Sequence, residues 1–121
     1  MEKKRILAID DSTAQLTTYQ GILSSQYTFR AAKSASDAIS FLNSNQVDMV
    51  HLDIEMPNVS GFEFLKDIRR IPSYMQVPII IISSKSGEEF DNQVKNSTAA
   101  DVLAKPIVPE KLVAIIEKHL T

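Results

Sequence analysis

Short apolar runs alternate with amphipathic stretches along the whole chain, and this alternation restricts the fold more than any other feature. Most of the runs are continuously apolar, as strands covered on both faces must be. They lie at residues 6–9, 28–32, 49–52, 77–82 and 102–104. Repeated strand–helix units predict an α/β fold, in which a five-stranded parallel sheet carries helices on both faces.

The stretches between the runs have apolar residues at helical spacing. They lie at 16–23, 35–42, 64–71 and 112–120, and Pro109 suits the first turn of the last helix. Segment 86–97 is also helical in pattern, but its only large apolar residues are Phe90 and Val94. We therefore expect the helix in 86–97 to be weakly anchored.

Composition excludes several classes of protein. The 121 residues suit one domain, 1–121, that buries its own core. A net charge of −2 without a basic run argues against nucleic-acid binding, and the absence of cysteine excludes thiol nucleophiles and thiolate zinc sites. The longest apolar run, "VPIIII", cannot cross a bilayer. We expect a cytoplasmic domain without a membrane partner.

Polar residues stand where the expected strands end. Asp10 and Asp11 follow the first strand, Asp53 the third, Ser83 the fourth and Lys105 the fifth. Ligands of parallel sheets bind outside the carboxyl ends of the strands, where the strand order reverses. Each residue alone could be an ordinary turn or surface residue, but together they predict one site.

The expected cluster suits metal-assisted phosphoryl chemistry. Two adjacent carboxylates repel one another, and Mg²⁺, which prefers oxygen ligands, would offset that repulsion at Asp10 and Asp11. The Asp53 carboxylate could then act as a nucleophile towards phosphorus. Lys105 and Ser83 would offset charge on the phosphoryl oxygens.

The segments "AIDDS", "HLDIEMPNVSG", "IIISS" and "LAKPI" resemble the receiver domains of two-component response regulators. The resemblance covers essentially the whole chain. The separations of 30 residues from Asp53 to Ser83 and 22 from Ser83 to Lys105 are typical of that family. It implies a flavodoxin-like sheet of strand order 2-1-3-4-5 with five helices.

The resemblance also implies roles for individual residues. Asp53 would accept a phosphoryl group, and Asp10, Asp11, Asp53 and the backbone carbonyl of Glu55 would hold Mg²⁺. Ser83 and Lys105 would contact the phosphoryl group. A cis peptide would precede Pro106.

The implied function is a phosphorylation-dependent signalling switch. The resemblance implies no enzyme activity other than phosphotransfer to the domain itself and autodephosphorylation. The phosphoryl donor would be a phosphohistidine on a sensor histidine kinase or phosphotransfer protein, and the output a contact with a downstream protein. We expect either a stand-alone receiver or one domain of a longer chain.

Departures from the family pattern leave two alternatives. Receivers usually carry Tyr or Phe at the position of Val102, so the chain could be a degenerate docking module that needs no phosphorylation. It could also be a haloacid-dehalogenase-like phosphatase, although that family has aspartate where Glu55 stands. If it is a receiver, we expect segment 86–97 to carry the conformational response.

Three further side chains invite specific hypotheses. Glu55 and Lys85 each lie two residues beyond a site residue, and we expect them to form an ion pair across the pocket. His51 should be a strand–helix packing residue. His119, near the end of the last helix, should complement the helix dipole.

Overall fold

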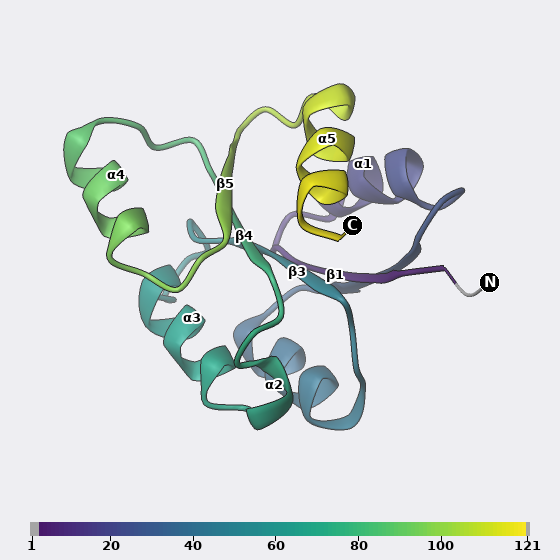
Figure 1. Cartoon of the computed structure of the whole chain (residues 1–121), viewed down its shortest axis with the longest axis horizontal. Coiled ribbons are helices and arrows are strands. Elements are labelled where there is room, and N and C mark those ends of the chain that lie inside the picture. The colour runs from purple at the N-terminus through teal and green to yellow at the C-terminus, as the bar shows by residue number, and fades with distance from the viewer. Residues whose placement is uncertain (1–2, 121) are drawn as a thin grey trace.

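The computed structural model describes residues 3–120. Five strands in this range form one parallel sheet of order β2-β1-β3-β4-β5 (Figure 1). This strand order confirms the topology expected from the sequence. The strands are β1 Arg5–Ile9, β2 Thr28–Ala32, β3 Met49–Asp53, β4 Ile79–Ser83 and β5 Asp101–Ala104.

Helices cover both faces of the sheet, with α1 and α5 on one face and α2, α3 and α4 on the other (Figure 1). The α-helices are α1 Thr13–Leu23, α2 Ala35–Ser44, α3 Gly61–Arg69, α4 Glu88–Lys95 and α5 Pro109–Leu120, with a short 3-10 helix at Pro72–Tyr74. Among residues 3–120, no helix combines the length and apolarity needed to span a bilayer.

The alternation of side chains along β1 explains the two-sided core. Leu7 and Ile9 pack with residues of α2 and α3, whereas Ile6 and Ala8 pack with residues of α1 and α5. Successive residues of a strand point to opposite faces, so a strand covered on both sides must be apolar throughout. The central strands β3 and β4 are accordingly buried along their whole length.

The start of β4 differs from the expected position. The apolar run begins at Val77, but the strand begins at Ile79. Pro78 has no N–H for the sheet ladder, although its carbonyl still accepts a 3.0 Å hydrogen bond from the N–H of Val50. The run therefore overestimates the strand by two residues.

Local contacts define the helices that follow β1 and β4. Ser12 caps α1, since its hydroxyl accepts a 3.2 Å hydrogen bond from the N–H of Gln15. Phe90 is buried and Val94 partly buried, so α4 has few anchors, as the sequence predicted. A groove of about 770 Å³ separates α4 from α3.

Candidate functional site

Three carboxylates converge at the carboxyl ends of β1 and β3. One carboxylate oxygen from each of Asp10, Asp11 and Asp53 lies within 4.8 Å of the other two. Asp10 follows β1 directly and Asp53 is the last residue of β3, and these two strands are neighbours in the sheet. Asp10 and Asp53 are buried, whereas Asp11 is exposed.

The Asp10 carboxylate is only half satisfied by the protein. Its Oδ1 accepts a 2.9 Å hydrogen bond from the N–H of Ser12, while its Oδ2 is buried without a partner. Burial raises the pKa of Asp10 to about 6; the Ser12 N–H opposes this rise, and the charge of Asp53 adds to it. An unpartnered buried oxygen beside two carboxylates fits a divalent cation with oxygen ligands.

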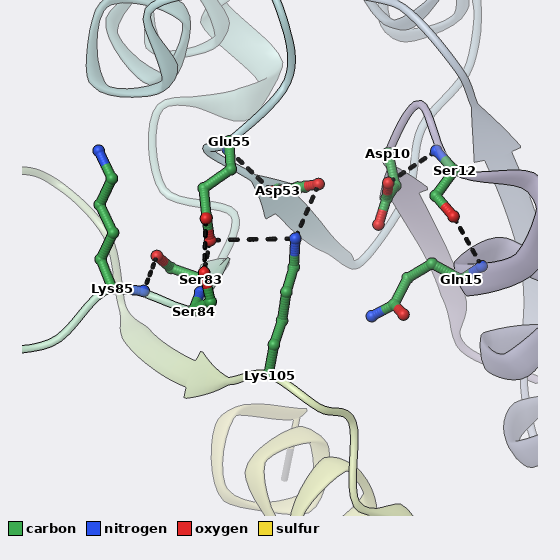
Figure 2. Close-up of polar contacts among 9 residues, drawn as sticks. All are labelled: Asp10, Ser12, Gln15, Asp53, Glu55, Ser83, Ser84, Lys85 and Lys105. Atoms are coloured by element: carbon green, nitrogen blue, oxygen red, sulfur yellow. Dashed lines mark hydrogen bonds and ion pairs between the residues drawn. The ribbon is translucent and has the colours of Figure 1, made fainter.

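Asp53 has a cation and a backbone donor as partners (Figure 2). Its Oδ2 lies 3.2 Å from Nζ of Lys105, and its Oδ1 accepts a 2.8 Å hydrogen bond from the N–H of Glu55. Lys105 comes directly after β5, and the Lys105–Pro106 peptide is cis, as the resemblance implied. The ammonium therefore lies beside the carboxylate at the centre of the sheet edge.

Ser83 lies between Asp53 and Lys105 in the order of the strands. It ends β4, which pairs with β3 on one side and β5 on the other, and its carbonyl accepts a 2.9 Å hydrogen bond from the N–H of Lys105. Its hydroxyl oxygen accepts a 2.9 Å hydrogen bond from the N–H of Lys85. The fold thus brings all five residues predicted from the strand ends to one edge of the sheet.

The prediction of an ion pair between Glu55 and Lys85 is wrong, because the described residues include no such contact. The Glu55 carboxylate instead accepts two hydrogen bonds from Ser84, one from its N–H and one of 2.6 Å from its hydroxyl. Lys85 extends away from this contact (Figure 2). Burial alone would raise the pKa of Glu55, but the Ser84 donors and Lys105 hold it below its usual value.

Sequence reasoning missed the Glu55–Ser84 contact altogether. The only signal for it was a serine at the position after Ser83, where a hydroxyl can reach across the pocket. Spacing alone could not choose between Ser84 and Lys85 as the partner, since both follow the same strand.

The two histidines lie outside the acidic cluster. His51 is fully buried, and its ring centroid lies 5.6 Å from that of Tyr19 in α1, which confirms the packing role. His119 does more than complement a dipole, because its Nε2 lies 3.0 Å from Oδ2 of Asp101. Asp101 also lies 3.4 Å from Nζ of Lys118, so the two side chains tie α5 to β5.

The geometry combines a cation site with donors for an oxyanion. The clustered carboxylates can share a divalent cation, and the carboxylate of Asp53 lies beside it as a potential nucleophile. The ammonium of Lys105 and the hydroxyl of Ser83 come from the two following strands. Such an arrangement can place a transferable anionic group on Asp53 and offset its charge.

Comparisons with known proteins agree with this geometry. The family model described as "Response regulator receiver domain" matches residues 6–117. The solved structure of the chemotaxis protein CheY4 from Vibrio cholerae superposes with a TM-score of 0.91 at 27% sequence identity, covering 98% of this chain and 99% of that one.

Curated relatives point to the same family. The two-component response regulator ORR5 of Oryza sativa subsp. japonica is 32% identical over 95% of this chain and 87% of its own length. A probable cyclic di-GMP phosphodiesterase of Vibrio cholerae is 31% identical over 95% of this chain, which spans only 26% of that protein. The chain therefore belongs to the family of response regulator receiver domains.

Proposed function

We propose that this receiver domain is a phosphorylation-dependent switch that accepts a phosphoryl group on Asp53. The donor is a phosphohistidine on a sensor histidine kinase or a histidine phosphotransfer protein. The observation that best supports the proposal is the placement of Asp53: its buried carboxylate lies among two other carboxylates and 3.2 Å from the ammonium of Lys105.

In the transfer, a carboxylate oxygen of Asp53 forms a bond to phosphorus as the bond from phosphorus to the donor's imidazole nitrogen breaks. The electron pair of the broken bond stays on that nitrogen. The ammonium of Lys105 offsets charge on the phosphoryl oxygens, and the hydroxyl of Ser83 donates a hydrogen bond to one of them. The phosphoryl group reaches Asp53 from the exposed edge of the sheet, where Asp11 lies.

Asp10, Asp11, Asp53 and the backbone carbonyl of Glu55 would hold Mg²⁺. The unpartnered Oδ2 of Asp10 supports this assignment. When bound, the cation supplies positive charge that neutralises the reacting oxygens. The protein's own part is to hold three carboxylates within 4.8 Å of one another, where they repel in the absence of a cation.

The readout of the switch is a contact with a downstream protein, made in the cytoplasm by residues 1–121 acting as one domain. A phosphoryl group adds about −1.5 to −2 charges at neutral pH on the usual phospho-residues. The α4 helix is the element most easily biased by that charge, because Phe90 is its only buried residue. Membranes and nucleic acids are not partners of this domain.

Incubation with a small phosphodonor, acetyl phosphate or phosphoramidate, tests the proposal. We expect one equivalent of phosphate per protein in the presence of Mg²⁺ and little in EDTA. No incorporation under either condition would favour the degenerate docking module. Sustained release of phosphate from an external phosphomonoester would favour a phosphatase.

A further inference from the structure

The Glu55 carboxylate accepts hydrogen bonds from both donors of Ser84, on the loop after the neighbouring strand. Its Oε1 accepts from the backbone N–H of Ser84, and its Oε2 accepts from the Ser84 hydroxyl at 2.6 Å. The same Oε1 lies 3.9 Å from Nζ of Lys105. Glu55 belongs to the loop after β3 and Ser84 to the loop after β4, so the contact joins these two loops beside Asp53 (Figure 2).

These partners are the donors that an anion attached to Asp53 would meet. Lys105 lies 3.2 Å from Asp53. Ser84 directly follows Ser83, the last residue of the neighbouring strand. A backbone N–H has a single hydrogen, so Ser84 cannot donate fully to Glu55 and to a phosphoryl oxygen at once. Two anions therefore compete for one set of donors.

We propose that the Glu55 carboxylate is an internal anion that occupies the phosphoryl-binding donors of the unphosphorylated domain. The inference rests on the proposed function and extends it: phosphoryl acceptance requires Glu55 to leave Ser84. Departure of Glu55 costs two charge-assisted hydrogen bonds. Glu55 thus sets the affinity of the site for an anion on Asp53, and Ser84 holds the Glu55 carboxylate in place.

The exchange of partners at Ser84 also has a route to α4. Ser84 and Gly87 bracket the short loop that leads from β4 into α4, and Gly87 lies just before the first helical residue, with a φ of 110°. The helix beyond it is anchored by Phe90 and borders the groove of about 770 Å³. Exchange of Glu55 for a phosphoryl group would therefore change the partner of the loop that leads into the least anchored helix.

Titration with beryllofluoride, an analogue of the phosphoryl group, in the presence of Mg²⁺ tests the competition. We expect Glu55→Ala to bind the analogue about three- to ten-fold more tightly than the wild type, since the competing hydrogen bonds are gone. Glu63→Ala is the matched control, because Glu63 is exposed on α3 and its removal changes the net charge equally. Its affinity should equal that of the wild type.

A second variant separates occupancy of the donors from simple charge repulsion. Ser84→Ala changes no charge but removes the 2.6 Å anchor of Glu55. We expect Ser84→Ala to tighten analogue binding by about two- to three-fold in the wild-type background. In the Glu55→Ala background the same substitution should leave affinity unchanged or weaken it.

The outcomes distinguish the two levels of the proposal. Equal affinity in the wild type and Glu55→Ala, or an identical effect of Ser84→Ala in both backgrounds, would overturn the role of Glu55 while leaving the receiver function intact. Absence of analogue binding in every folded variant would overturn both. Circular dichroism and the Ser84 amide resonance, which should shift in Glu55→Ala, verify that the variants fold and that the contact exists without the analogue.

Discussion

Nζ of Lys105 lies 3.2 Å from Oδ2 of Asp53, and the Asp53 side chain is only 4% exposed. The cation at the end of β5 is therefore the direct counter-ion of a buried carboxylate at the end of β3. Removing one partner of such a pair leaves the other charge buried and uncompensated. Here the uncompensated charge would also face Asp10 and Asp11.

Lys105→Ala should therefore destabilise the domain in EDTA by about 1–3 kcal/mol, measured by urea unfolding. Added Mg²⁺ should reduce the difference in unfolding free energy between Lys105→Ala and the wild type, because the cation replaces positive charge beside Asp53. Lys66→Ala is the control, since Lys66 is exposed and pairs only with Glu63 among the described residues. Equal losses in the two variants would show that Lys105 has no special electrostatic role.

Asp11→Ala should weaken Mg²⁺ binding by about ten-fold or more, because it removes a ligand from a three-carboxylate cluster. In EDTA its melting temperature should equal or exceed that of the wild type, since one of three repelling charges is gone. Isothermal titration and thermal melts measure the two effects. Glu117→Ala provides the same charge change on an exposed face of α5. A sharply lower melting temperature in EDTA would mean that Asp11 is structural.

Substitution of alanine for glycine at two positions should change the free energy of unfolding in opposite directions. A Cβ at Gly61 would lie 2.3 Å from Cβ and 2.6 Å from the backbone Cα of Ile54, so Gly61→Ala should cost about 1–3 kcal/mol. A Cβ at Gly21, inside α1, would meet nothing within 4 Å, so Gly21→Ala should add about 0.5–1 kcal/mol through helix propensity. Urea unfolding of both variants checks the pair, and a stable Gly61→Ala would contradict the close packing of α3 on Ile54.

The apolar pattern was sufficient for the fold class because the two-sided burial of a parallel sheet leaves a strong signal, whereas the strand order came from the resemblance to receiver domains. Runs such as 79–82 are apolar on both faces, and the site residues were located simply by where those runs end. The strand order implied by that resemblance put Asp53, Ser83 and Lys105 at the ends of neighbouring strands, as the structure has them.

Side-chain partners could not be predicted in the same way. The choice of Glu55 between Ser84 and Lys85 depends on the paths of two loops, which charge patterns do not encode. His119 binds Asp101 because α5 packs beside β5, a tertiary contact between residues 18 positions apart. The start of β4 was misplaced because an apolar pattern does not register the missing N–H of Pro78.

The contact of Asp101 with α5 predicts a pH-dependent contribution to stability. Burial would raise the pKa of Asp101, but hydrogen bonds from His119, the N–H of Val102 and Lys118 hold that pKa below its usual value. A lowered pKa means that the stabilisation is complete above the unfolded-state pKa and is lost as the pH falls through the folded-state value. Asp101→Asn should thus be less stable than the wild type at pH 5.5 by up to about 1 kcal/mol.

The difference in unfolding free energy between wild type and Asp101→Asn should shrink as the pH falls below the unfolded-state pKa of the carboxyl. It should vanish only below the lowered folded-state pKa of Asp101, where both proteins carry an uncharged side chain at this position. Urea midpoints from pH 5.5 towards pH 3 give the comparison. A difference that stays constant down to pH 3 would mean that the charge of Asp101 does not stabilise the attachment of α5.

Intact-mass spectrometry after treatment with acetyl phosphate and Mg²⁺ tests the central assignment most directly. We expect the wild type to gain a single adduct of ~80 Da and Asp53→Asn to gain none, because an amide has nearly the shape of the carboxylate but is a poor nucleophile. Circular dichroism should show that Asp53→Asn remains folded. A folded Asp53→Asn protein that still gains the ~80 Da adduct would place the phosphoryl group on another residue and contradict the account.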